Sequence, residues 1–397
     1  MKRQSILIEL GLPYFSHARE LISGILDYSH RNFPEWRFLT EPLDFFQAFQ
    51  PGFMRPELVQ GAFVIAYDRR PSLAALLDRG VPVINLTLPE VDLGIPSVTI
   101  DDRAVGRLAA EHLDRPAISE TLYVGIDLKR SRLRYEAFSE ALCARGKPKP
   151  HHFAEDKTGL TDPPARRMKR LAATIKKLRQ APPGRLGIFA FSDSFAHAVA
   201  EVCVEMGLSL PRDVVLVSCD NDEQICNLSH VPLSSIPSNG RKIGYLAAEA
   251  LHSLMEGESI SPLTLVEPLH VVERLSSSRV AVDDQVVAKA LGIINEQAHT
   301  GLRVYEILEF LPVSRRNLEA RFRKTLGCSP YEQIERVRVE LAFAKLREDR
   351  ETNAKIAIAC GFGSSNHFER AFRKITGHPP SFFRGGHQPS KMASKAS

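Results

Sequence analysis

The chain has 397 residues, more than one ordinary hydrophobic core organises, so two or three compact units are expected. Hydrophobic residues make up 44% and charged residues 25%, a composition that excludes fibrous and wholly disordered classes. The net charge of +5 is uneven: residues 283–397 hold 19 Lys and Arg against 13 Asp and Glu, whereas residues 1–282 are close to neutral. A basic C-terminal end is typical of a domain that binds nucleic acid, although it can also serve solubility alone.

The sequence carries no pattern for export or for a membrane span. In MKRQSILIELGLPY the apolar run is broken by Glu9 and is too short for a signal peptide, and nowhere do 18 consecutive apolar residues occur. The six cysteines form no CxxC pair and no His/Cys metal spacing, so reduced thiols are expected. These features predict a cytoplasmic protein without a metal or another cofactor.

Residues 1–275 alternate strand-like apolar runs with amphipathic helical patterns, as the βαβ units of a parallel sheet do. The pair His151-His152 falls in KPKPHHFAEDK, which we interpret as a solvated polar loop and not as a metal site. The alternating pattern of residues 1–275 predicts an α/β fold. Its predicted strands are SILIEL, GAFVIAYD, VPVINLT, SVTIDD, TLYVGI, RLGIFAFSD and VVLVSCD.

Polar or aromatic residues follow several of these strands. Because ligands of open α/β sheets bind beyond the carboxyl ends of the strands, these side chains are expected to converge on one cleft. Carboxylates and amides suit sugar hydroxyls, and an aromatic ring can cover the apolar face of a sugar; each residue taken alone could instead cap a helix or hold a loop. The candidate effector-binding residues are Tyr14, Phe15, Asp68, Thr87, Asp193, Asp220 and Asn221.

The C-terminal part contains an internal repeat with an offset of 50 residues. Each copy has the pattern of a short apolar helix, a tight turn and a second helix that begins after Ser314 or Ser364, which is typical of a helix-turn-helix. Between the copies, Ser329 and Pro330 precede a longer helical pattern that would hold two major-groove contacts roughly 34 Å apart. The matched residues are Ser314, Glu319, Phe322, Arg323, Lys324, Gly327 and Pro330 with Ser364, Glu369, Phe372, Arg373, Lys374, Gly377 and Pro380.

Helical spacing sorts the second helix of each copy into two faces. Leu318 with Phe322, and Phe368 with Phe372, are expected to point inward. The opposite faces suit DNA, because Arg can hold a guanine edge and Asn an adenine edge, while basic residues further along a helix meet phosphates; a merely solvated face is the alternative. The candidate DNA-binding residues are Arg315, Arg316, Glu319, Ala320 and Arg323 in the first copy, and Ser365, Asn366, Glu369, Arg370, Arg373 and Lys374 in the second.

The stretch IACGFGSSNHFERAFRKITGHPPSFFR resembles the C-terminal signature of the AraC/XylS family of transcription regulators, and the resemblance spans about residues 285–385. It implies an all-α DNA-binding domain with two helix-turn-helix units. The first turn, Leu311-Pro312-Val313, departs from the family pattern because it lacks the usual glycine. The family positions that match are Gly361, Phe362, Phe368, Phe372, Gly377, Pro380 and Arg384.

The stretch LGIFAFSDSFAHAVAEVCVEMGLSLPRDVVLVSCDND resembles the sensor of the lactose-repressor/galactose-repressor family, over most of residues 1–275. That resemblance implies a two-lobed, periplasmic-binding-protein-like fold in which Arg134, Asp193 and Asp220 contact the effector. Ala137 stands where this family usually has glycine. Joined to an AraC-type C-terminal domain, the sensor implies activation of sugar-utilisation genes by a pentose such as xylose.

The sequence thus predicts an α/β two-lobed sensor followed by an all-α domain with two helix-turn-helix units, acting on promoter DNA with a sugar effector and RNA polymerase. A homodimer is expected, and the helix in DDRAVGRLAAEHL resembles a dimer-forming segment, although its apolar face could equally pack within the lobe. The expected boundaries are a sensor at 1–275 (lobes 1–113 plus 236–275, and 114–235), a linker at 276–284, a DNA-binding domain at 285–386 and a disordered tail at 387–397.

Three other functions compete with this prediction. An enzyme is disfavoured because no phosphate loop of the GxxxxGK type, no GxSxG elbow and no HExxH motif occurs. A transport-associated sugar-binding protein would have an export signal and no DNA-binding repeat. A repressor with the same parts stays open, because the sign of regulation depends on where the site lies relative to the promoter.

Overall fold

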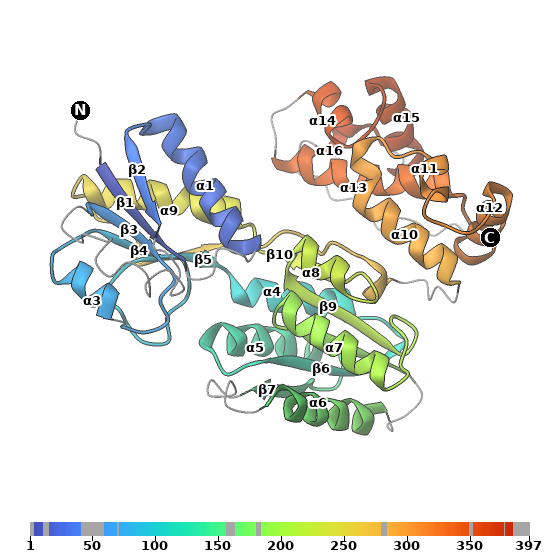
Figure 1. Ribbon diagram of the computed structural model, residues 1–397, viewed down its shortest axis with the longest axis horizontal. Coiled ribbons are helices and arrows are strands. Elements are labelled where there is room, and N and C mark those ends of the chain that lie inside the picture. The colour runs from blue at the N-terminus through green and yellow to red at the C-terminus, as the bar shows by residue number, and fades with distance from the viewer. Residues whose placement is uncertain are drawn as a thin grey trace. The chain divides into compact units, whose positions relative to one another are not determined.

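The computed structural model divides into two compact units, residues 1–277 and 278–397 (Figure 1). Tyr14, Phe15 and the tail expected at 387–397 lie outside the residues that the structure describes, as do Gly377 and Arg384 of the C-terminal signature. The described residues are 4–10, 16–40, 59–69, 71–155, 163–179, 184–278, 284–348, 352–376 and 378–383.

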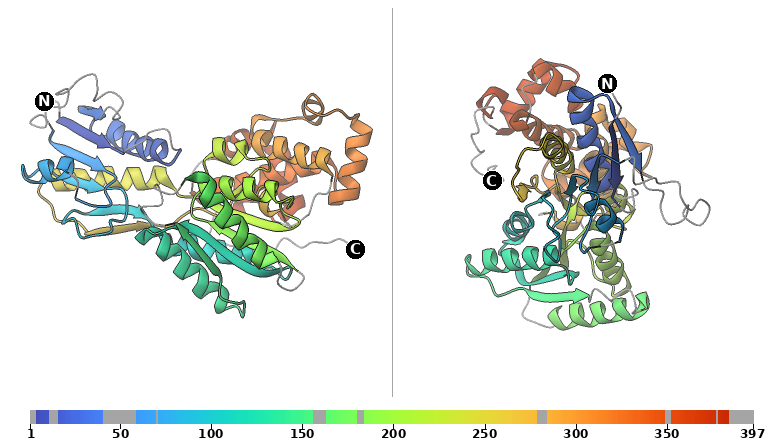
Figure 2. Two further views of the ribbon diagram at one scale, coloured as in Figure 1. Left: turned by 60° about the horizontal axis from the view of Figure 1, so that its bottom comes forward. Right: turned by 90° about the vertical axis from the view of Figure 1, so that its left-hand side faces the viewer.

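The first lobe of unit 1 is a six-stranded parallel sheet in the order β11-β5-β4-β3-β1-β2. Helices α1 and α9 pack together on one face of this sheet, and α3 covers the other face (Figures 1 and 2). The elements are β1 Gln4–Glu9, α1 Ser16–Asn32, β2 Trp36–Thr40, β3 Gly61–Val64, α3 Pro71–Leu77, β4 Val83–Asn85, β5 Ser97–Ile100, α9 Gly240–Met255 and β11 Leu263–Val266.

The second lobe is a five-stranded parallel sheet in the order β10-β9-β8-β6-β7, with α4 and α5 on one face and α6 and α7 on the other. Strands β6, β8, β9 and β10 are largely buried on both faces, as expected of a parallel sheet, whereas the edge strand β7 is partly exposed. The elements are α4 Asp102–Leu113, β6 Ile118–Ile126, α5 Lys129–Cys143, β7 His151–Glu155, α6 Pro164–Arg179, β8 Arg185–Ala190, α7 Asp193–Glu205, β9 Val214–Asp220, α8 Glu223–Leu228, β10 Ser234–Pro237 and the short 3-10 helix η3 Leu275–Ser277.

The chain passes between the two lobes three times, at residues 100–102, 237–240 and 267–271. The second and third crossings are hydrogen-bonded to each other, because Leu269 N donates to Pro237 O (3.0 Å) and Asn239 Nδ2 donates to Glu267 O (3.2 Å). Three crossings between two lobes permit hinge motion.

All seven predicted strands are present, but the loop predicted at His151-His152 is a strand, although both side chains are exposed as expected. These residues form β7 at the edge of the second sheet, where His151 Nε2 lies 3.2 Å from the Glu120 carboxylate and the His152 ring stacks on Tyr135 at 4.2 Å. Their polar sequence does not reveal an edge strand, because half of such a strand faces solvent. Among the described residues there is no group of three metal-ligating side chains, and none of their helices is long and apolar enough to cross a membrane.

The apolar face of α4, for which two interpretations were open, packs within its own lobe against α5. Ala109, Ala110 and Leu113 are fully buried there.

Unit 2 is all helical and contains both copies of the repeat. Leu318, Phe322, Phe368 and Phe372 are fully buried, as the helical spacing predicted. The elements are α10 Gln285–Gln297, η4 Ala298–Thr300, α11 Val304–Leu308, α12 Arg315–Leu326, α13 Pro330–Glu348, α14 Asn353–Ala359, α15 Ser365–Thr376 and α16 Pro380–Phe383.

The predicted helix starts are confirmed by their caps. Ser314 Oγ accepts from Asn317 N (3.3 Å), and Ser364 Oγ accepts from His367 N (3.2 Å), so both second helices begin with a serine cap. At the start of α13, Ser329 and Glu332 form a reciprocal capping box.

The two copies meet at a buried junction beside α13. Arg338 donates to Ala298 O and to Leu302 O (both 2.8 Å) in the first copy, and its guanidinium lies 5.8 Å from the centre of the Phe362 ring in the second copy. Gly361, with φ 81°, brings the second turn close to the backbone of Ala298 and His299. The first turn, 309–314, has no residue with positive φ, so the missing glycine gives it a different shape.

Replacing Gly361 by alanine should therefore destabilise unit 2. An added Cβ would lie 2.4 Å from Ala298 O, and the positive φ disfavours any L side chain, so a loss of about 1–3 kcal/mol is expected in chemical denaturation of the full chain followed by circular dichroism. Gly363→Ala is the matched control, because nothing lies within 4 Å of its Cβ position. Equal stability of the two variants would contradict the close junction.

Candidate functional site

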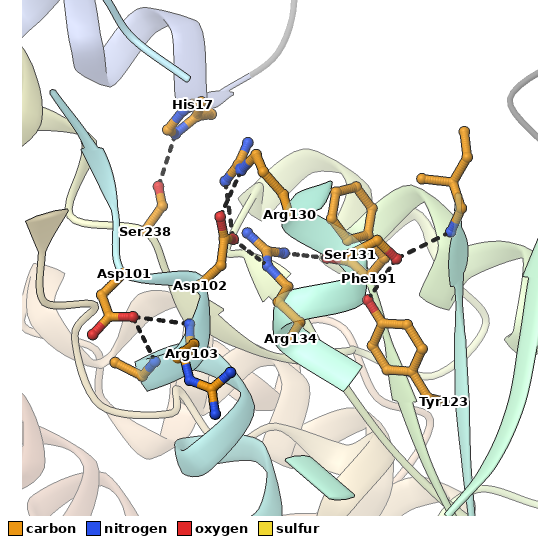
Figure 3. A network of polar contacts seen from close by, with 12 residues as sticks. His17, Asp101, Asp102, Arg103, Tyr123, Arg130, Ser131, Arg134, Phe191 and Ser238 are labelled. Atoms are coloured by element: carbon orange, nitrogen blue, oxygen red, sulfur yellow. Dashed lines mark hydrogen bonds and ion pairs between the residues drawn. The ribbon is translucent and has the colours of Figure 1, made fainter. Parts of the chain in front are cut away.

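A buried carboxylate, Asp102, lies at the first crossing between the lobes. It is the first residue of α4, and the preceding Asp101 caps that helix by accepting from Arg103 N (2.9 Å) and Ala104 N (3.0 Å) (Figure 3). Asp102 accepts from Arg130 Nε (2.9 Å) and Arg134 Nε (2.7 Å), which lie one turn apart on α5. One carboxylate therefore pairs with two buried guanidinium groups.

Arg134 is enclosed on all sides, with 1% of its surface exposed. It donates to Phe191 O at the end of β8, and its guanidinium lies 4.6 Å from the centre of the Phe191 ring. Its Nη2 has no hydrogen-bond partner among the described residues. A buried guanidinium with a spare donor suits a polar ligand or a water molecule.

A histidine from the first lobe faces this cluster. His17, near the start of α1, has its Nδ1 2.9 Å from Ser238 Oγ at the second crossing (Figure 3). Burial, together with the charges of Arg130 and Arg134, lowers the pKa of His17 to about 3. The imidazole is therefore neutral at physiological pH and can both donate and accept a hydrogen bond.

Two further carboxylates lie at the ends of β8 and β9. Asp193 is 1% exposed and accepts from Ser218 Oγ, Ser235 Oγ (both 2.5 Å) and Asp222 N (2.6 Å). Burial and the neighbouring Asp220 raise the pKa of Asp193 to about 7, and burial raises the pKa of Asp220. Asp193 is thus tied into the protein, which leaves Asp220 as the carboxylate with more freedom to meet a ligand.

The turn after β9 is strained. Asp220 has φ 107° and Asn221 has φ 52°, values that non-glycine residues seldom adopt. Ser235 Oγ accepts from Asn221 N (2.9 Å), and Arg274 Nη2 donates to Asn221 Oδ1 (2.9 Å). Such strain is characteristic of functional sites, where the surrounding contacts hold it in place.

The structure brings together some of the predicted effector residues and leaves others apart. Arg134, Asp193 and Asp220 interact electrostatically in the second lobe, with Asn221 beside them. Asp68 is exposed after β3, and Thr87 is buried with a hydroxyl that has no partner among the described residues.

Sequence reasoning missed four residues of this cluster. Arg130 could have been found four residues before Arg134, and Asp102 could have been found directly after a predicted strand. His17 and Ser238 gave no local signal, because they come together only through the crossings.

One contact joins the lobes at the rim. Glu90 of the first lobe accepts from Lys129 N, at the start of α5, and from Arg132 Nη2 (3.0 Å). Leu128 precedes α5 and supplies no side-chain cap, so the cap comes from the other lobe. This carboxylate therefore stabilises contact between the lobes, with help from the partial positive charge of the helix start.

The predicted DNA-reading positions lie on the outer faces of α12 and α15. On α12, Arg315 and Glu319 pair with each other (2.9 Å), and Arg316, Ala320 and Arg323 are exposed. On α15, five side chains line one surface hollow: Asn366, Glu369, Arg370, Arg373 and Lys374. Ser365, at the start of α15, is half-buried.

Helix α15 is fixed to α13 by its inner flank. His367 Nε2 lies 2.8 Å from the Glu335 carboxylate and 3.0 Å from the Tyr331 hydroxyl. Lys374 Nζ lies 3.7 Å from Glu332, an exposed ion pair that is weak in water and easily exchanged for a phosphate.

Two family models match the chain: a periplasmic binding protein-like domain over residues 110–277 and a helix-turn-helix domain over residues 307–386. The xylose operon regulatory protein of Escherichia coli K12 is 27% identical over 382 residues, which cover 93% of this chain and 94% of that protein. The protein of the same name from Haemophilus influenzae is 27% identical over 295 residues, covering 73% of this chain and 74% of that protein. A solved structure of a xylose-binding transcription activator matches with a TM-score of 0.58 and 25% identity, covering 97% of this chain and 99% of that chain.

These comparisons confirm the resemblance and the fold class that the sequence predicted. The chain contains a periplasmic binding protein-like domain and a helix-turn-helix domain, and along nearly its whole length it is similar to proteins named as transcription regulators.

Because Asp102 compensates two buried arginines, Asp102→Asn should lower the free energy of unfolding of the sensor by about 3–5 kcal/mol. The matched control is Glu140→Gln, which weakens the exposed pair with Arg103 and should cost less than about 1 kcal/mol. Urea denaturation of the full chain measures both. If Asp102→Asn were as mild as its control, the buried charge cluster would not be a stability element.

Proposed function

We propose that this chain is a sequence-specific transcription regulator controlled by a monosaccharide, with a pentose such as xylose as the first candidate, bound between the two lobes of the sensor. The observation that carries the proposal is the presence, in one chain, of a polar interlobe cluster and a duplicated helix-turn-helix. Two relatives are named as regulators of a xylose operon, and one solved structure is described as that of a xylose-binding activator. These names support the choice of sugar.

The chemistry of the cluster suits a polyhydroxyl ligand. The neutral His17 and the spare donor of Arg134 can meet sugar oxygens, while Asp220 and Asn221 can accept from sugar hydroxyls. The full proposed effector set also retains Tyr14, Phe15, Asp68, Thr87 and Asp193.

In this proposal residues 1–275 form the sensor, 276–284 the linker and 285–386 the DNA-binding domain. Sugar binding closes the lobes at the three crossings, the Glu90 contact stabilises closure, and DNA affinity changes in response. The chain acts in the cytoplasm as a homodimer and activates transcription with RNA polymerase. Repression by the same parts is the alternative, and the position of the DNA site relative to the promoter decides between them.

Asp220→Asn should weaken binding of D-xylose by about 1–3 kcal/mol, because an acceptor oxygen is replaced by an amide donor and a sugar hydroxyl loses its partner. Asparagine tolerates positive φ better than most residues, so the fold should survive, whereas Arg134→Ala would leave Asp102 with one partner fewer. Isothermal titration calorimetry measures the affinity, after a thermal-shift screen of pentoses, hexoses and their phosphates has tested xylose against the other sugars.

The control for this variant is Asp78→Asn, the same change at an exposed site of the first lobe. It should bind the sugar as the native chain does. If Asp220→Asn also kept native affinity, the site would not include the end of β9.

For the DNA-binding face, Arg370→Ala should cost about 1–3 kcal/mol on the specific site and relax the preference at one or two base pairs; Asn366→Ala should behave alike. Lys374→Ala should instead weaken specific and scrambled duplexes nearly equally and lower the salt slope by about one unit, because a phosphate contact carries no sequence information.

Fluorescence titration of both duplexes at several salt concentrations separates these outcomes. Lys289→Ala, an exposed charge removed from α10, is the control and should change neither the affinity nor the ratio. An unchanged specific-to-scrambled ratio in Arg370→Ala and Asn366→Ala would mean that α15 does not read sequence.

A further inference from the structure

Arg274 lies near the C-terminal end of unit 1 and connects it to the strained turn after β9. The side chain is 8% exposed and donates to Leu233 O (2.8 Å) and to Asn221 Oδ1 (2.9 Å). Its own backbone N donates to Ser234 Oγ (2.7 Å). One guanidinium therefore bridges the turn that carries Asp220 and the segment that leads out of the sensor.

The residues that follow Arg274 are also held by several hydrogen bonds. Ser276 Oγ donates to Leu216 O (2.7 Å) and accepts from Ser234 N (2.8 Å), and Ser277 Oγ lies 2.7 Å from Ser234 Oγ. All three serines are fully buried. These hydrogen bonds connect residues 276–277 directly to β9 and β10.

A second set of contacts reaches the same segment from α4. His112 Nε2 lies 2.6 Å from Ser277 Oγ, and Arg115 Nη1 donates to Ser277 O (2.5 Å). Helix α4 begins at Asp102, so its two ends contact the buried charge cluster and Ser277 respectively. Two independent elements of the second lobe therefore converge where the sensor ends and unit 2 begins.

The turn beside Arg274 is held in an unusual backbone conformation by its neighbours. Asp220 and Asn221 are held at positive φ by contacts with Ser235 and Arg274, so a ligand that engages Asp220 changes the balance of strain in the turn. Arg274 contacts the side chain of Asn221 but is not among the groups proposed to touch the sugar.

We infer that Arg274 is a positioning residue for regulation: it couples the occupancy of the effector cleft, through Asn221, to the segment that leads into the DNA-binding unit. The inference rests on the proposed function. It requires that replacing Arg274 reduce the effect of the sugar on DNA affinity. The affinity for the sugar alone and the affinity for DNA alone should stay the same, because the coupling free energy is separate from either affinity.

The test compares Arg274→Lys and Arg274→Gln with the native full chain. Lysine keeps the charge but lacks the two-pronged donor geometry that reaches both Leu233 O and Asn221 Oδ1. Calorimetry with D-xylose gives the sugar affinity, and fluorescence titration of the specific duplex with and without D-xylose gives the coupling.

Both variants should bind D-xylose, and sugar-free DNA, within about twofold of the native chain. The sugar-dependent change in DNA affinity should fall from the native value, about 5- to 150-fold in typical allosteric proteins, to less than twofold. Arg179→Lys is the matched control. Arg179 lies in the same lobe and, like Arg274, donates to a backbone carbonyl, Gly184 O (2.7 Å), and to a side-chain oxygen, that of Asp213. Among the described residues it has no contact with 274–277. Its coupling should stay native.

Native coupling in folded Arg274→Lys and Arg274→Gln would overturn the inference while leaving the proposed function intact. If the native chain itself showed no sugar-dependent change in DNA affinity with any sugar of the screen, the proposed function would fail and the inference with it. Should thermal melts show both variants unfolded, Ser277→Ala removes the hydroxyl that contacts Ser234 and His112, and it must reduce the coupling for the inference to stand.

Discussion

The pairing of Asp102 with Arg130 and Arg134 is the interaction on which the sensor depends. Taking two guanidinium groups out of water costs several kcal/mol each, and only a well-placed carboxylate with further hydrogen bonds offsets that cost. Asp102 sits at a crossing between the lobes, so the same ion cluster fixes α4 against α5 and positions Arg134 beside the cleft. The atoms that stabilise the second lobe are therefore the same atoms that we propose to meet the effector.

The second lobe combines this rigid cluster with a strained turn. Asp193 accepts three short hydrogen bonds and holds the ends of β9 and β10 together, while Asp220 and Asn221 adopt backbone angles that cost of order 1–3 kcal/mol each. The contacts of Ser235 and Arg274 offset that cost. A site built in this way can respond to a ligand without unfolding, because the strain is confined to two residues.

Duplication in unit 2 produces two copies that are alike in core and cap but unequal in their turns. Gly361 allows the second turn to pack closely against the first copy, whereas the first turn lacks a residue with positive φ. Arg338 on α13 satisfies carbonyl groups of the first copy and lies over the Phe362 ring of the second. The spacing of the two outer faces is consequently a property of α13 and its junction, beyond the repeat itself.

The sequence by itself determined the features that depend on local periodicity. Apolar runs located seven of the strands, the 50-residue repeat located α12 and α15, and serine at 314 and 364 located their starts. A motif resemblance also named Arg134, Asp193 and Asp220 as effector contacts, which stays a prediction. The edge strands β2, β7, β10 and β11 escaped prediction, because their short or polar sequences do not stand out as apolar runs.

Only the tertiary structure decided which side chains meet. His17 and Ser238 are separated by 221 residues, Asn221 and Arg274 by 53, and Asp102 and Arg134 by 32. No local pattern encodes such contacts, because they arise where the three crossings bring strand ends and helix starts of the two lobes together. The buried polar cluster and the contacts of Arg274 are therefore consequences of topology, whereas the elements that carry them are consequences of sequence.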